Sequence, residues 1–395
     1  MRLLLYKVFA ERTAVTKRRG IARSRQYPDA SFYMILRGFR SQMRVSNTVT
    51  RTFVLLLIAS GALRSGAQSK LNSPWDSHPV KMTNVPYSCP QLPHLSPDLT
   101  TNSYYSDSKS SMIDPVKMKA YAESSGPYKN LGSAAVAAAD AYRTTGSRDA
   151  ATCVRSLLNQ AAVDHVFTGK MSSTQAYFVQ GWVIGALAIS YLKVRDSGVI
   201  PSSEAATIVA WMKSVATQTL DFFEGRTAFT GSWQTNNHLY WGGIAIGSIG
   251  IAANDQTMLD WAVAAYRKGI GQIAADGTMP LEMRRGQRAL HYHLFAAAPL
   301  VYLAEFGEDN GIDLYAEQDH ALRRLIKRST DGLIDNHYFE EKSGVKQDAP
   351  NGAPTAEEIG WAVPYVKRFP DPTISSLIAK ASSLNEMYLG GLPPS

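Results

Sequence analysis

Cysteine is scarce in this sequence, because Cys89 and Cys153 are the only two among 395 residues. Two thiols allow at most one bridge within the chain, and in an oxidising compartment a Cys89–Cys153 disulfide is the simplest arrangement. Two unrelated free thiols are the alternative. No cysteine stands near His291 and His293, and no other histidine matches them at helical spacing. The sequence therefore predicts no metal site and no cofactor.

A surplus of basic charge is missing from most of the chain, although the formal net charge is +8. Residues 1–68 hold 13 Lys and Arg against 2 Asp and Glu. Of the 41 basic and 33 acidic residues in total, 28 and 31 therefore remain in 69–395, a balance of −3. The basic character belongs to the N-terminal segment, so no nucleic-acid partner is expected.

The N-terminal apolar run Phe53–Ala59 is too short to span a membrane comfortably. Two arginines precede it within 43–67, and small residues follow, with Ser65 and Ala67 suited to positions −3 and −1 of a cleavage site. The pattern predicts a signal peptide over 43–67 and a secreted or periplasmic protein without stable membrane insertion after cleavage. Residues 1–42 then represent a misassigned upstream start or an unstructured extension.

Strand signals are sparse, whereas apolar residues recur at three- and four-residue spacings from about residue 132 onward. Expected helices cover 132–146, 149–162, 173–195, 202–225, 237–252, 256–273, 282–305, 314–328, 355–366 and 372–388. Repeated helical hairpins of this kind predict an all-α (α/α) toroid with a deep central cleft. We expect an extended arm and lid segment over 68–115, the toroid domain over 116–390, and a polar insertion over 329–354 at the edge of the cleft.

Polar side chains that suit chemistry fall into two clusters. The first is Asn236, Asn237 and His238; the second is Arg285, Arg288 and Tyr292. The predicted helix 282–305 places the second group on one face. Each residue also has a structural alternative: Asn236 as a helix N-cap, the histidine as a hydrogen-bonding group, the tyrosine as core. Guanidinium groups buried on one helix face need an anionic partner, and Glu282 can satisfy one of them locally.

The combination of the clusters resembles the alginate lyase family of polysaccharide lyases, which have a helical toroid fold. The motifs are N-N-H-L-Y-W at 236–241 and R-G-Q-R-A-L-H-Y-H at 285–293. The resemblance extends from about Cys89 to Tyr365 and includes W-A-V-P-Y at 361–365. The spacing of the two cysteines is also similar to the family's bridge.

The resemblance implies β-elimination on 1,4-linked uronate polymers, with alginate or poly-mannuronate favoured and glucuronan or related polymers also compatible. The reaction removes the C5 proton of a uronic acid and expels the 4-O oxygen, so the adjacent carboxylate must first be neutralised. By resemblance, Asn237 and Arg285 neutralise it. Tyr292 is the acid, and also the base for syn elimination, whereas His238 serves as base or carboxylate stabiliser. Tyr292 would need its pKa lowered by the guanidinium groups to act as a base.

The implied substrate-binding residues are less sharply defined by the sequence. They are Gln175 and Trp182, Tyr104 and Tyr105 in the lid segment (residues 101–111), Tyr240, Arg288 and Lys346. The family often has a lysine just before the lid tyrosine, where this chain has Ser103. The expected partner is an anionic polysaccharide.

Two other function classes compete with the lyase. A glycoside hydrolase on the same fold would need two carboxylates across the bond, and Asp276, Glu282 and Glu341 are available. A non-catalytic polysaccharide-binding protein would use only the cleft and its aromatic residues, and would not require an acid–base pair. The sequence leaves open which uronate is preferred, whether cleavage is endo or exo, whether His238 or Tyr292 is the base, and the oligomeric state.

Overall fold

The computed structural model describes residues 70–348 and 353–394, and helices dominate both ranges. The expected signal peptide and the extension before it lie outside the described residues. The longer helices are α2 (Pro115–Thr145), α3 (Arg148–Val163), α4 (Thr174–Val194), α5 (Ser202–Phe223), α6 (Asn237–Ala253), α7 (Gln256–Ile270), α9 (Ala289–Glu308) and α10 (Glu317–Ile334). The shorter ones are η1 (Ser232–Gln234), α8 (Pro280–Met283), η2 (Gly286–Arg288), α11 (His337–Ser343), α12 (Ala356–Ile359), α13 (Ala362–Arg368), α14 (Pro372–Lys380) and η3 (Met387–Leu389).

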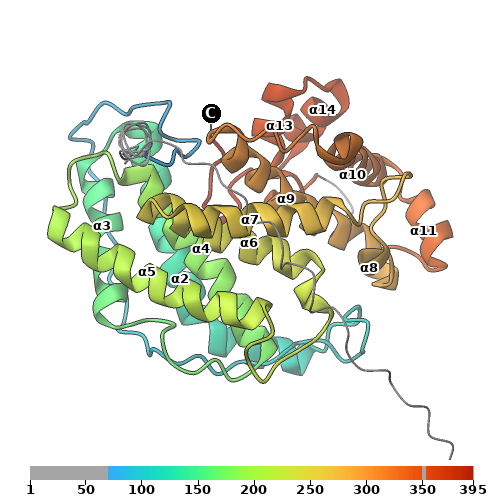
Figure 1. Ribbon diagram of the computed structural model, residues 1–395, viewed down its shortest axis with the longest axis horizontal. Coiled ribbons are helices and arrows are strands. Elements are labelled where there is room, and N and C mark those ends of the chain that lie inside the picture. Colours follow the sequence, from blue (N-terminus) through green and yellow to red (C-terminus); the bar gives the residue numbers. More distant parts are fainter. Residues whose placement is uncertain (1–69, 349–352, 395) are drawn as a thin grey trace, which may run out of the picture. The chain divides into compact units, whose positions relative to one another are not determined.

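Successive helices alternate between an inner and an outer row, as an (α/α) toroid requires. The inner row runs α2–α4–α6–α9, and the outer helices α3, α5, α7 and α10 pack behind it. Figure 1 shows α5 and α7 lying across α4 and α6. The outer helices α3 and α7 bury one face, whereas α4, α6 and α9 are buried almost all round. The expected fold class is confirmed for the described residues.

Small residues let the inner helices approach closely. A Cβ at Gly185 of α4 would lie 3.3 Å from the Cα of Ala245 on α6. The apolar part of α4 is long enough to cross a membrane, but 94% of it is buried inside the protein, as expected for a core helix.

The segment between Lys70 and Asp114 is irregular, as expected for an arm. It makes only isolated bridges, such as Thr83 with Ser147, and is fastened by the Cys89–Cys153 disulfide. The predicted pairing of the two cysteines is therefore confirmed, and the bridge ties the arm to α3.

Some helices begin or end at other residues than the sequence predicts, because helix caps and one glycine set their limits. α2 begins at Pro115 rather than near 132, because Asp114 caps it by accepting hydrogen bonds from two backbone N–H groups. The expected polar insertion 329–354 is partly helical, since α10 continues to Ile334 and α11 follows. The expected helix 282–305 is broken at Gly286, whose φ of 59° is unfavourable for other residues.

Candidate active site

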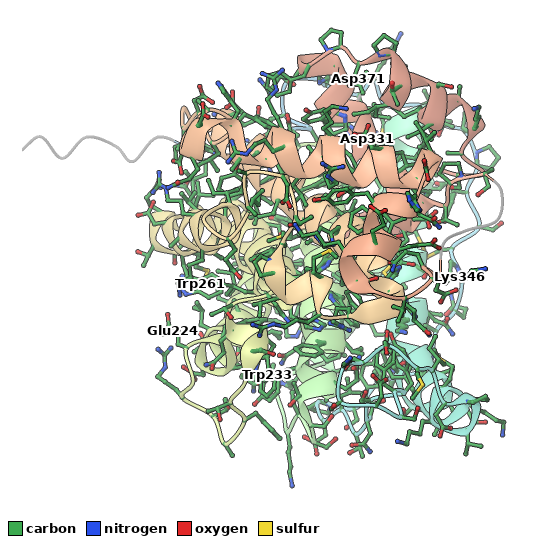
Figure 2. The ribbon with its side chains drawn as sticks, turned by 90° about the vertical axis from the view of Figure 1, so that its right-hand side faces the viewer. Glu224, Trp233, Trp261, Asp331, Lys346 and Asp371 are labelled. Carbon is green, nitrogen blue, oxygen red and sulfur yellow. A yellow bond between two sulfur atoms is a disulfide. The ribbon has the colours of Figure 1, made fainter. Side chains whose placement is uncertain are left out.

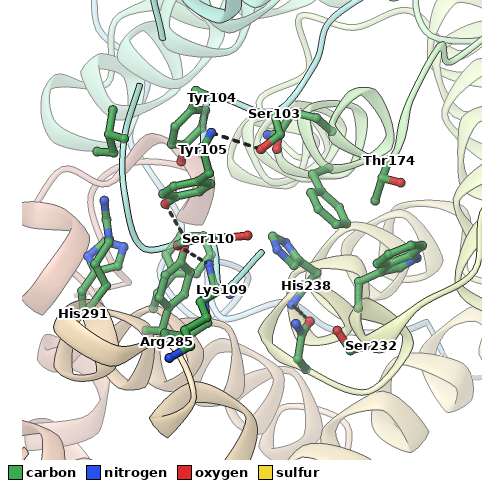
Figure 3. A pocket seen from close by; sticks show the side chains of 18 of the residues that line it. Ser103, Tyr104, Tyr105, Lys109, Ser110, Thr174, Ser232, His238, Arg285 and His291 are labelled. Atoms are coloured by element: carbon green, nitrogen blue, oxygen red, sulfur yellow. Dashed lines mark hydrogen bonds between the residues drawn. The ribbon is translucent and has the colours of Figure 1, made fainter. Parts of the chain in front are cut away.

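A cavity of about 1300 Å³ opens at one end of the inner helices. Its walls come from α2, α4, the start of α6, the η2–α9 region, the lid segment and the chain around η3. Figure 3 shows His238 on one side, with Arg285 and His291 on the other and the lid residues Tyr104 and Tyr105 beside them. The cavity is the place where the two polar clusters of the sequence meet.

The lid segment is closed over this cavity through three contacts. The hydroxyl groups of Tyr105 and Tyr292 lie 2.6 Å apart. Arg285 donates to the Ser110 carbonyl at 3.1 Å, and Gln287 donates to the Ser111 carbonyl at 3.0 Å. Inside the lid, Asp107 accepts hydrogen bonds from the backbone of residues 109, 111 and 112 and from the Ser111 hydroxyl.

His238 lies in the first turn of α6, and its ring faces the cavity. Asn236 caps this helix by accepting from the His238 backbone N–H at 3.1 Å, so its expected capping role is present. The imidazole stacks on Phe178 with ring centroids 3.6 Å apart. Burial, and then the positive charge of Arg285, hold the pKa of His238 well below 6.5, so its imidazole is neutral at neutral pH.

Asn237 lies behind the cavity wall rather than on it. Its side chain is fully buried, and its Nδ2 donates to Glu282 at 2.9 Å. Its backbone N–H donates to the second oxygen of the same carboxylate at 3.1 Å. Burial raises the pKa of Glu282, against the opposing charge of Arg285. Asn237 therefore joins α6 to Glu282 and is not among the residues that line the cavity, although its Oδ1 has no hydrogen-bond partner.

Arg285 and Tyr292 contact each other although they do not lie on one face of a continuous helix, because the helix is broken before α9. The guanidinium carbon of Arg285 lies 3.3 Å from the centroid of the Tyr292 ring. Two turns of a continuous helix were expected, but η2 separates Arg285 from α9. Burial raises the pKa of Tyr292 above 10, and this effect exceeds the opposing one of Arg285. A role as base would require a lowered pKa, whereas in this state the Tyr292 phenol is protonated.

Unpaired nitrogen atoms gather at this cavity. Among the described residues, six buried side-chain nitrogens have no hydrogen-bond partner. Five of them line the cavity and belong to Gln175, Trp233, His238, Arg285 and Arg288, whereas the sixth, Nε of Arg324, lies outside the cavity lining. Buried polar groups in proteins are nearly always paired, so such a cluster requires a ligand or water to complete it. Four of the five cavity nitrogens always carry a hydrogen, and Nδ1 of His238 carries one in one of its tautomers, so the cluster complements an anionic or hydroxyl-rich molecule.

Most of the sequence-predicted binding residues line the cavity, but two do not. Gln175, Trp182, Tyr104, Tyr105 and Arg288 are among the lining residues. Tyr240 is fully buried, donates to the Thr235 carbonyl and is not among the lining residues. Lys346 is exposed and lies at the outer edge of the molecule, outside the cavity lining (Figure 2).

Several cavity residues were not predicted from the sequence. Tyr121 and Lys129 come from the part of α2 before residue 132, where no helix is expected from the sequence, and the Lys129 ammonium lies 4.1 Å from the centroid of the Tyr121 ring. His291 lines the cavity 3.8 Å from Glu357, whereas His293 is fully buried and accepts from the Met279 N–H. The spacing of these two histidines in a helix points them apart, and that signal was available in the sequence.

The carboxylates considered for a hydrolase do not line the cavity. Asp276 bonds to Tyr338 and pairs with Lys342, Glu282 holds Asn237, and Glu341 pairs with His337. Among the described residues, no three His, Cys, Asp or Glu side chains are grouped as a metal ion would require.

Comparison with known proteins decides the class. Residues 98–339 match the family model described as alginate lyase. A polysaccharide lyase of Stenotrophomonas maltophilia is 33% identical over 306 residues, which cover 77% of this chain and 88% of that protein. The chain belongs to the alginate lyase family. It is a polysaccharide lyase, and the hydrolase and non-catalytic alternatives are set aside.

Other relatives of the lyase support the same assignment. An alginate lyase of Cobetia marina is 39% identical over 171 residues, covering 42% of this chain and 45% of its own length. Alginate lyase A1-III of Sphingomonas species A1 is 20% identical, with a TM-score of 0.63 over 87% of this chain and 92% of that one. An A1-III variant complexed with a tetrasaccharide gives a TM-score of 0.70 at 20% identity, over 78% and 86% of the two chains. These solved structures share the fold.

Proposed function

We propose that the lyase is exported and cleaves 1,4-linked uronate polymers, poly-mannuronate foremost, by β-elimination. The observation that carries the proposal is the convergence of His238, Arg285 and Tyr292 around one cavity whose polar nitrogens lack partners. The Cys89–Cys153 disulfide fits an oxidising compartment outside the cytoplasm.

Arg285 neutralises the substrate carboxylate in this proposal. Its Nε has no partner and its planar fork suits a carboxylate, while its terminal nitrogen holds the lid at Ser110. Removal of the C5 proton puts further negative charge on that carboxylate, so a fixed cation beside it lowers the barrier more than it stabilises the bound substrate. Asn237 contributes indirectly, by holding Glu282 next to Arg285.

Tyr292 donates its proton to the departing 4-O oxygen. The phenol is protonated before the reaction because burial raises its pKa, and its hydroxyl points to that of Tyr105, 2.6 Å away. Displacement of the Tyr105 hydroxyl by the glycosidic oxygen would keep Tyr292 hydrogen bonded. For syn elimination, substrate binding and Arg285 first lower the pKa of Tyr292, so that its phenol releases its proton to solvent. The resulting phenolate takes the C5 proton and passes that same proton to the departing 4-O oxygen. His238, neutral and with an unpaired Nδ1, is the base for the epimer whose C5 proton lies on the opposite face.

A direct assay tests this proposal. Purified protein is incubated separately with poly-mannuronate, poly-guluronate, glucuronan and hyaluronan, and the ultraviolet absorbance of the C4–C5 double bond is followed. We expect absorbance to rise fastest with poly-mannuronate. New reducing ends without that absorbance, or inactivity on every polymer, would contradict the proposal.

The pH dependence of the reaction follows from the state of His238. A lowered pKa means that the imidazole gains its proton only well below pH 6.5 and is neutral at every higher pH. The pH dependence of kcat/KM reports groups of the free enzyme. We therefore expect that protonation of His238 lowers kcat/KM only at pH values below 6.5. A pH–rate profile of the parent and of His238→Asn checks this. An acidic limb centred at 6.5 or higher that disappears in the variant would refute it.

A further inference from the structure

The C-terminal segment Asn385–Leu392, here called the C-terminal wall, forms part of the cavity although it is remote in sequence from the catalytic cluster. Its helix η3 packs against α2, α4 and α9, and so bridges both ends of the inner row. Glu386, Met387 and Tyr388 line the cavity. The half-buried ring of Tyr388 lies 5.2 Å from that of Trp182, measured between centroids.

A buried lysine fastens this wall. The side chain of Lys193, on α4, is almost fully buried, and its ammonium donates to Asp140 at 2.5 Å and to the carbonyls of Gly390 and Leu392 at 2.6 and 2.9 Å. Asp140, on α2, also accepts from the side chain of Asn385 at 2.7 Å and from the Leu392 N–H at 2.9 Å. The Lys193–Asp140 ion pair therefore holds both ends of the wall by hydrogen bonds. Each of the three ammonium protons of Lys193 has an acceptor.

The turn of the wall fits this ion pair closely. Gly390 and Gly391 have φ values of 77° and 93°. A Cβ at Gly391 would lie 2.3 Å from a carboxylate oxygen of Asp140, and one at Gly390 would lie 2.2 Å from Ile189. Both the backbone conformation and the space therefore require glycine.

Stability alone does not account for such an arrangement. A buried ion pair is often no more stabilising than apolar residues of the same volume, whereas it fixes geometry through directional hydrogen bonds. Here the ion pair fixes the cavity wall that carries the ring of Tyr388. Gln175 lines the same cavity, is more than nine-tenths buried and has an unpaired Nε2. An aromatic face and an unpaired amide donor in one cavity suit a sugar ring, with its apolar face and its oxygen atoms.

We propose that the C-terminal wall is a working part of the substrate site: Tyr388 and Trp182 hold a sugar beside the one that reacts, and Lys193 with Asp140 are positioning residues for Tyr388. This inference rests on the proposed function, since it takes the substrate to be a uronate chain longer than one sugar. It assigns no step of the chemistry to the wall, so its loss affects binding and not the reactivity of the bound sugar.

Binding to an inactive enzyme tests the inference apart from catalysis. In a Tyr292→Phe background, the dissociation constant of a mannuronate tetrasaccharide is measured by tryptophan fluorescence. We expect Tyr388→Ala to raise it about tenfold, as for a buried aromatic contact, and Tyr388→Phe to leave it within twofold. Lys193→Met should act like Tyr388→Ala. The double variant Lys193→Met/Tyr388→Ala should be no weaker than either alone, because both changes remove the same contact.

Controls separate positioning from general damage. Lys213→Met breaks another lysine–aspartate pair, with Asp255, outside the cavity lining, and should leave binding unchanged. If Lys193→Met does not fold, Asn385→Ala removes one exposed donor to Asp140 and is expected to weaken binding severalfold. Unchanged binding by Tyr388→Ala, or additive losses in the double variant, would overturn the inference. A parent enzyme that cleaves no uronate polymer would instead refute the proposed function.

Discussion

Tyr292→Phe is expected to lower kcat on poly-mannuronate by about 10³-fold, equivalent to about 4 kcal/mol of barrier, while substrate binding changes by less than twofold. The variant removes only the hydroxyl that carries the proton. The ring remains buried beneath the Arg285 guanidinium, so the carboxylate site should stay intact. Single-turnover rates and dissociation constants measured on the same protein separate the two effects.

Tyr105→Phe is the matched control for this experiment. It breaks the same 2.6 Å hydrogen bond from the lid side but leaves the Tyr292 hydroxyl in place. A loss of less than about tenfold is expected, since one hydrogen bond contributes about 1 kcal/mol. Activity of Tyr292→Phe within tenfold of the parent would exclude Tyr292 as the acid.

Arg285→Lys is expected to lower kcat/KM by about 10²-fold, and Arg285→Met by about 10³-fold. Lysine retains the positive charge but loses the planar fork, whereas methionine loses both. Methionine also leaves the buried Glu282 without its nearest compensating cation, so the melting temperature of each variant must be recorded alongside activity.

The lid contact of Arg285 needs its own control. Gln287→Ala removes the neighbouring lid contact to Ser111 without changing charge. It should raise KM severalfold and leave kcat nearly unchanged. If Gln287→Ala reproduced the full loss seen in Arg285→Met, Arg285 would act through the lid and not through the substrate carboxylate.

The sequence was most informative where the chemistry depends on residue type. His238, Arg285 and Tyr292 could be named from two motifs, and the structure brings them to one cavity. Their local geometry was not predictable in the same way. The positive φ of Gly286 ends the expected helix and turns Arg285 over the Tyr292 ring, and periodicity alone gives no warning of that break.

Other parts of the site arise from tertiary packing that no local pattern encodes. Asn237 looked like a substrate ligand, but its amide is engaged by Glu282, which lies 45 residues further along the chain. Tyr388 ends the last predicted helix, 372–388, but α14 stops at Lys380, and Lys193 and Asp140 hold the segment that carries Tyr388. Charge makes Lys346, and its place in the motif makes Tyr240, a binding candidate in the sequence, but Tyr240 is fully buried and Lys346 lies outside the cavity lining.

The internal hydrogen bonds of the lid determine how the enzyme should release its product. Because the hydrogen bonds of Asp107 to residues 109, 111 and 112 lie within the lid, none of them has to break for the lid to leave the cavity. It can swing as a preformed flap once its contacts at Arg285, Gln287 and Tyr292 are broken. Little loop-ordering entropy is then lost on each closure, so the cycle of opening and closing should depend on a few breakable contacts and only weakly on chain flexibility.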